Sequence, residues 1–160
     1  MTKPALFLRI ASVMTFIHAL LHTVGGVFGK VAPGPATIAV QAMKLNQFLL
    51  LGHTRSYWDF YLGMGLAVSI VLTAEAVVFW QLASLAKTDA ARLRPIIATL
   101  LVAYGLLSVN SSLYFFFGPV ITEILIAACL ALAFITAKPH ASQSVTSSSR
   151  FLATDQNKAF

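Results

Sequence analysis

Four long apolar runs limit what this chain can fold into. They cover about residues 5–28, 57–83, 95–117 and 119–137. Because an α-helix rises about 1.5 Å per residue, each run can cross a hydrocarbon core of about 30 Å. We therefore expect an all-α integral membrane protein, a four-helix antiparallel bundle formed by a single transmembrane domain over residues 1–138.

The composition supports the same class. Hydrophobic residues make up 58% of the chain and charged residues 10%, and the mean hydropathy is +0.82. These values exclude an ordinary soluble domain of this length. The net charge of +6 would suit a nucleic-acid-binding protein, but the basic residues lie at the edges of the apolar runs. The predicted partner is therefore the lipid bilayer and not nucleic acid.

The basic residues also predict the orientation of the helices. With a cytoplasmic N-terminus, eight basic side chains lie inside and three outside, namely Lys30, Lys44 and Arg55. This distribution satisfies the positive-inside rule and places both termini in the cytoplasm. The polar, serine-rich segment 139–160 is then expected to be a disordered cytoplasmic tail.

The first outer connection, between the runs 5–28 and 57–83, carries an amphipathic pattern. In ATIAVQAMKLNQFLLLG, the apolar residues Ile38, Ala42, Leu45 and Leu49 share one helical face. This pattern predicts an amphipathic interfacial segment at the outer membrane surface. Two roles are compatible with it: covering the end of the bundle, or acting as a lid over an outward-facing pocket.

The second run opens with RSYWDFYLGMG, which has features of a helix start at the membrane surface. Ser56 and Asp59 have the spacing of a capping box. An interfacial aromatic belt is predicted from Tyr57, Trp58 and Tyr61. Small residues, which let transmembrane helices approach closely, recur further along at Gly65, Ser69 and Thr73.

Two histidines stand inside the first run, in the stretch FIHALLHTVGG. His18 and His22 are four residues apart and are therefore expected to share one helical face. Small or polar residues project onto the same stripe, namely Ala11, Thr15, Gly25 and Gly29. Because such a stripe suits helix contacts better than lipid, we expect both histidines to point into the bundle.

Polar groups from the other three runs fall at a similar predicted depth, in the outer half of the membrane. They are Asp59, Asn110, Tyr114 and Glu123. Ionisable groups in a bilayer cost about 2.5 to 3.5 kcal/mol each, so their shared depth favours a buried site. Glu75 lies nearer the cytoplasmic side, where we expect it to reach the surface or pair with Lys87 or Arg92.

Several kinds of chemistry are compatible with this outer cluster. The predicted catalytic residues are His18, His22 and Glu123, because an imidazole and a carboxylate can pass a proton across a helix interface. The predicted ligand-binding residues are Asp59, Asn110, Tyr114, Trp58 and Tyr61. Transition-metal or haem binding through the imidazoles is an alternative, although no metal ligand set is assigned and no cofactor is identified. A purely structural role, hydrogen bonding between helices, is equally compatible.

Four stretches carry a resemblance to a known group: LRIASVMTFIHALLHTVGG, RSYWDFYLGMGL, FWQLASLAKTDAARLRPII and CLALAF. Over about residues 6–135 the chain resembles an uncharacterised family of small bacterial four-helix inner-membrane proteins. That resemblance implies a multi-pass protein of the bacterial inner membrane and no known activity. A more distant architectural likeness, to the EXPERA group of emopamil-binding sterol isomerases, implies a lipid-like ligand and proton transfer by His and Glu.

Two functions from different classes follow from these patterns. The first is a membrane protein that binds a lipophilic small molecule in an outward-facing polar pocket and acts on it by acid–base chemistry. The second is a non-enzymatic subunit or scaffold that binds a partner membrane protein, or a second copy of itself, through its small-residue stripes. The haem or metal alternative lies between them.

Overall fold

The computed structural model describes residues 2–138, and this part of the chain contains four long helices. These are α1 (Lys3–Leu21, extended by the π-helix His22–Val27), α3 (Tyr57–Asp89), α4 (Arg94–Tyr114) and α5 (Phe117–Thr136). Each is long and apolar enough to cross a membrane, so that prediction is confirmed. The segment 139–160, predicted as a disordered tail, lies outside the described residues.

Helix α1 changes type at the second histidine. The sequence predicts an α-helix as far as residue 28, but after Leu21 the backbone continues as a π-helix from His22 to Val27. The amide of Phe28 donates to the carbonyl of Thr23 at 3.0 Å, which is the five-residue spacing of a π turn. A side chain at Gly29 would collide with the Gly25 carbonyl, so a glycine is required where the chain leaves this turn.

The first connection differs from the prediction. Helix α2 (Pro35–Leu45) is present but ends before Leu49, which the sequence placed on the same helical face. Strands β1 (Gln47–Leu50) and β2 (His53–Ser56) follow as an antiparallel hairpin, so the expectation of an all-α chain is wrong at this point. Leu51 and Gly52 both have positive φ, of 48° and 81°, as a two-residue hairpin turn requires.

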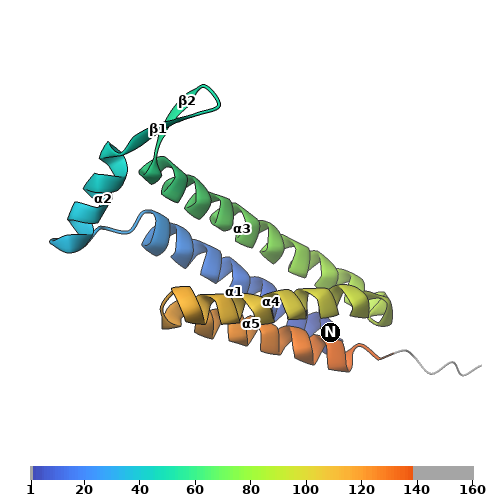
Figure 1. Ribbon diagram of the computed structural model, residues 1–160. Coiled ribbons are helices and arrows are strands. Elements are labelled where there is room, and N and C mark those ends of the chain that lie inside the picture. The colour runs from blue at the N-terminus through green and yellow to red at the C-terminus, as the bar shows by residue number, and fades with distance from the viewer. Residues whose placement is uncertain (1, 139–160) are drawn as a thin grey trace, which may run out of the picture.

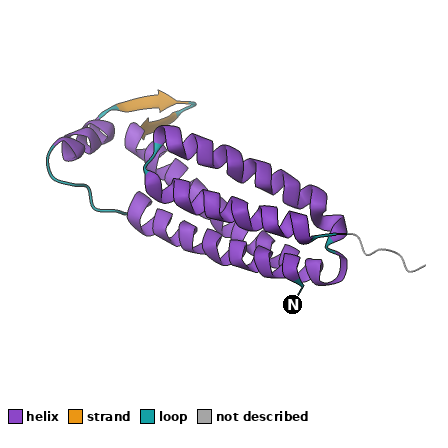
Figure 2. Cartoon of the chain, turned by 90° about the horizontal axis from the view of Figure 1, so that it is seen from below, coloured by secondary structure: helices purple, strands orange, loops and turns teal. Residues whose placement is uncertain are grey.

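The four long helices lie side by side, and α2 and the hairpin project beyond one end of them (Figures 1 and 2). Hydrogen bonds join Thr2 to the Ala86 carbonyl and His22 to the Gly65 carbonyl. As residue numbers rise along α1 they therefore fall along α3, and the two helices run in opposite directions. The short connection Ala91–Leu93 likewise returns the chain from α3 into α4.

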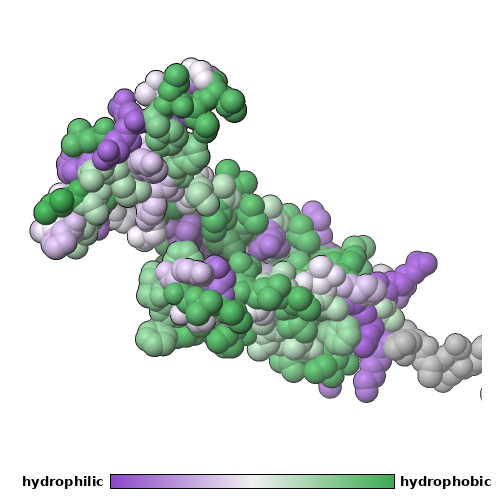
Figure 3. All heavy atoms as spheres, in the orientation of Figure 1, coloured by the Kyte–Doolittle hydropathy of each residue, from purple (hydrophilic) through white to green (hydrophobic). Residues whose placement is uncertain are grey.

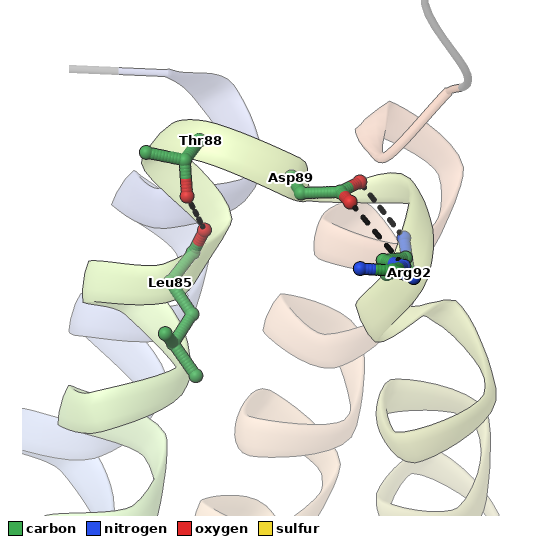
Figure 4. Close-up of polar contacts among 4 residues, drawn as sticks. All are labelled: Leu85, Thr88, Asp89 and Arg92. Atoms are coloured by element: carbon green, nitrogen blue, oxygen red, sulfur yellow. Dashed lines mark hydrogen bonds and ion pairs between the residues drawn. The ribbon is translucent and has the colours of Figure 1, made fainter.

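The connection between α3 and α4 is held by Asp89 and Arg92 (Figure 4). The carboxylate of Asp89 accepts from the Arg92 amide at 3.3 Å and forms an ion pair with its guanidinium at 3.6 Å. Both side chains are mostly exposed, so the pair contributes little to stability. Figure 3 shows apolar residues over most of the visible bundle and hydrophilic residues toward its ends, which is the distribution a membrane-crossing bundle needs.

Arg94 ties the start of α4 to the end of α5. Its guanidinium donates to the carbonyls of Phe134 and Ala137 at 3.0 and 3.1 Å and stacks on the Phe134 ring at 4.0 Å. The last carbonyls of a helix have no partner within the helix, and Arg94 supplies one.

Replacing Arg94 with alanine is expected to lower the free energy of unfolding by about 1 to 2 kcal/mol, because two charge-assisted hydrogen bonds are lost at a partly buried helix end. Thermal unfolding in detergent measures the effect. The control is Arg92→Ala. This substitution removes the same charge two residues before Arg94, but it breaks only the exposed ion pair with Asp89, so it should change stability by less than about 1 kcal/mol. Equal effects of the two substitutions would contradict the role assigned to Arg94.

Candidate functional site

The bundle interior contains a set of buried polar side chains among its apolar residues. Apart from the helix-capping Ser56, they are Ser12, Thr15, His18, Ser69, Ser111 and Glu123. A buried polar group costs free energy unless it forms a hydrogen bond, so the partners of each group indicate its role. Some of these side chains are fully partnered across helices, and two are not.

Tyr104 of α4 is the centre of a partnered group. The tyrosine is fully buried, and its hydroxyl donates to Oε2 of Glu75 on α3 at 2.9 Å. The same hydroxyl lies 3.4 Å from Oγ1 of Thr15 on α1, and the ring packs on Phe79 at 5.8 Å between centroids. Glu75 thus binds Tyr104 in the bundle and forms no ion pair with Lys87 or Arg92, contrary to the prediction.

Glu123 of α5 is only partly satisfied. Its Oε1 accepts a hydrogen bond from the Ser111 hydroxyl of α4 at 2.9 Å. Its Oε2 atom is buried and has no partner within residues 2–138, and the side chain is only 6% exposed. An unpaired buried oxygen of this kind costs about 1 to 3 kcal/mol, which calls for a compensating role.

His18 of α1 is the second unsatisfied group. The residue is 9% exposed, and its Nδ1 atom is buried without a partner among the described residues. His18 follows Thr15 by three positions and therefore lies on the same side of α1, the side that faces Tyr104.

The two unsatisfied groups lie at neighbouring depths. Thr15 and Tyr104 contact each other, and α1 and α4 both run opposite to α3. His18 is three residues beyond this contact along α1, whereas Ser111, the partner of Glu123, is seven residues beyond it along α4. The difference of four residues corresponds to about 6 Å along the bundle axis.

His22 also points into the bundle, and its partner lies on α3. Its Nε2 atom lies 3.1 Å from the Gly65 carbonyl of α3, so it takes part in the α1–α3 contact. Thr23 donates to Ser69 at 2.8 Å in the same contact. A methyl group at Gly65 would meet Val27 at 3.0 Å, which accounts for the small residue at this position.

The predicted ligand-binding residues lie outside the buried group. Asp59 is exposed and forms the expected capping box with Ser56. Its carboxylate accepts hydrogen bonds from the Ser56 amide at 2.8 Å and from the Ser56 hydroxyl at 2.9 Å. Trp58 stacks on Tyr61 at 5.3 Å and lies under the Lys44 amine at 5.0 Å. Asn110 and Tyr114 are exposed on α4.

The buried polar residues therefore differ from the set that the sequence predicts. His18 and Glu123 are retained, whereas Tyr104 is added to the group. The sequence carried one signal for this: Tyr104 is the only polar aromatic residue within the apolar core of its run.

Within residues 2–138 no group of three or more His, Cys, Asp or Glu side chains is placed to hold a metal ion. Comparison of the chain with protein-family models, curated proteins and solved structures finds no match. The resemblance to small bacterial inner-membrane proteins stays a prediction. Function is therefore inferred from the buried side chains themselves.

Proposed function

We propose that this chain is an integral protein of the bacterial inner membrane, folded as an antiparallel four-helix bundle with both termini in the cytoplasm. Four helices of sufficient length and apolarity support the membrane assignment. The basic residues Lys3, Lys87, Arg92 and Arg94 at one end of the bundle support the cytoplasmic side. In this orientation α2 and the hairpin lie at the outer interface.

The proposed function is the binding of a lipophilic small molecule through a polar group that enters the bundle between His18 and Glu123. The observation that carries this proposal is that Nδ1 of His18 and Oε2 of Glu123 are both buried and both lack a partner within residues 2–138. A ligand hydroxyl or carbonyl would satisfy them, and the apolar body of the ligand would pack among the helices.

This arrangement suits acid–base chemistry on the bound molecule. A neutral imidazole offers one donor and one acceptor nitrogen, and a carboxyl group can give or take a proton. His18 and Glu123 come from α1 and α5, so a polar atom held between them would contact groups of both types. Ser111 orients the Glu123 carboxyl through its hydrogen bond.

Native mass spectrometry of the detergent-purified protein tests the proposal. We expect a discrete small-molecule adduct on the wild type and at least a tenfold loss of it in His18→Ala and in Glu123→Gln, because each removes a hydrogen-bonding group that contacts the ligand. Asn110→Ala, which changes an exposed polar residue in the same half of α4 as Ser111, is the control and should keep the adduct.

Two results would contradict the proposal. One is an adduct that all four proteins carry equally. The other is a wild type without any adduct whose stability falls when His18 or Glu123 is replaced, because that pattern belongs to groups that only join helices. The second result would favour the alternative of a scaffold that binds partner membrane proteins.

A further inference from the structure

Arg9 is a charged side chain within the first membrane span that has no anionic partner. Its Nε atom is buried without a hydrogen bond, and no carboxylate of residues 2–138 forms an ion pair with it. The guanidinium instead lies over the ring of Trp80 on α3, 3.9 Å from the ring centre. An arginine carries five N–H donors, and the face of an aromatic ring satisfies none of them in full.

The energies indicate that something further binds Arg9. A charged residue costs about 2.5 to 3.5 kcal/mol at the centre of a span and less toward its ends, whereas an arginine stacked on an aromatic ring recovers about 0.5 to 2 kcal/mol. The acidic residues on either side of Trp80 along α3 are already engaged, because Glu75 accepts a hydrogen bond from Tyr104 and Asp89 pairs with Arg92. An anion from outside the described chain would supply the missing acceptor.

The end of the bundle at which Arg9 lies is strongly basic. In the described chain Asp89 is the only acidic residue there, against five further basic residues at Lys3, Lys87, Arg92, Arg94 and Lys138. Lys87 is seven positions after Trp80 and so lies on the same face of α3, about 10 Å nearer the membrane surface. Clusters of this kind attract the phosphates of anionic lipids.

An open apolar groove begins at Val77, about one helical turn from Trp80, and runs along the same face of α3. Thr73, Val77 and Trp80 follow the spacing of one helical face, and the groove is lined by Leu66, Ser69, Ile70, Thr73, Ala74 and Val77. From Val77 to Leu66 it extends for about 16 Å, which matches the roughly 15 Å thickness of one leaflet's hydrocarbon layer.

We propose that Arg9 of α1 and the adjoining exposed face of α3 bind an anionic phospholipid. The lipid phosphate accepts hydrogen bonds from the Arg9 guanidinium, which Trp80 holds in place, and Lys87 adds positive charge toward the surface. One acyl chain lies in the groove that leads from Val77 toward Leu66. A free phosphate ion could use only the first of these contacts, so the groove distinguishes a lipid from a soluble anion.

Native mass spectrometry with added phosphatidylglycerol and phosphatidylcholine tests this site. We expect the wild type to retain phosphatidylglycerol preferentially, and Arg9→Gln to lower that preference about fivefold, the value of one basic residue near a lipid phosphate. Lys3→Gln removes the same charge from the same end of the bundle but from a different face of α1, and should lower the preference by less than twofold. If Arg9→Gln does not fold, Lys87→Gln replaces it with an expected twofold to threefold loss.

A separate substitution tests whether the groove on α3 holds an acyl chain. Ala74→Phe fills it without touching the charged groups, and should weaken binding of long-chain phosphatidylglycerol while a short-chain form binds as before. Equal retention of both lipids by the wild type, or equal effects of Arg9→Gln and Lys3→Gln, would overturn the proposal. So would displacement of the lipid by millimolar inorganic phosphate, since that result indicates a site for free anions. The adduct proposed at His18 and Glu123 is unaffected by these substitutions, so the two proposals fail separately.

Discussion

Replacing Tyr104 with alanine is expected to lower the free energy of unfolding by about 3 kcal/mol, the largest effect of any single substitution we predict. Tyr104 is fully buried, packs on Phe79 and joins α4 to α1 and α3 through its hydroxyl. Aromatic-to-alanine changes cost about 3 to 5 kcal/mol in soluble proteins. The low end applies in a bilayer, because packing contacts are lost whereas the transfer of apolar surface from water plays little part.

Reversible unfolding of the protein in mixed micelles, followed by circular dichroism, measures this change. Tyr104→Phe keeps the ring and removes only the hydroxyl, so it should cost about 0.6 to 1.7 kcal/mol, the range for hydrogen bonds between membrane helices. Tyr114→Ala removes an exposed tyrosine from the same helix and should change stability by less than about 0.5 kcal/mol. If Tyr104→Ala and Tyr114→Ala had the same effect, Tyr104 would not be a core residue.

The long helices could be predicted because apolar length alone determines them. Each run exceeds what a membrane crossing needs, and glycine, proline or charged residues stand near its ends. The hairpin of β1 and β2 could not be predicted in the same way. Gln47–Leu50 reads as a continuation of an amphipathic helix, and the turn at Leu51 and Gly52 places a leucine at positive φ, which sequence patterns rarely favour.

Burial of the candidate residues was predicted in part. The stripe of small and polar residues predicted that His18 points into the bundle, and His18 is buried there, as is Glu123. The direction of a side chain around the helix is harder to predict, because it depends on which neighbouring helix packs against each face. His22 keeps α-helical geometry after His18 and meets the Gly65 carbonyl of α3, whereas Asn110 lies on an exposed face although Ser111 beside it is buried.

Glu123→Leu is expected to raise the stability of the ligand-free protein by about 1 to 3 kcal/mol while abolishing retention of the bound molecule. The substitution removes the buried Oε2 that lacks a partner, and a leucine is easier to bury in a bilayer than a carboxyl group. Ser111 loses its acceptor, but a helical serine can donate instead to a carbonyl four residues earlier. A residue kept at a cost to stability is typical of a functional site.

The matched control is Glu75→Leu, which is expected to change stability in the opposite direction. Glu75 accepts the hydrogen bond of the fully buried Tyr104 hydroxyl, so its removal leaves that donor with only the longer contact to Thr15. The stability of both variants is measured after the bound molecule has been removed. Mass spectrometry of the untreated variants measures how much of that molecule each retains. If both substitutions destabilised the bundle to a similar extent, Glu123 would be a structural residue like Glu75, and the ligand site would have to be sought elsewhere in the protein.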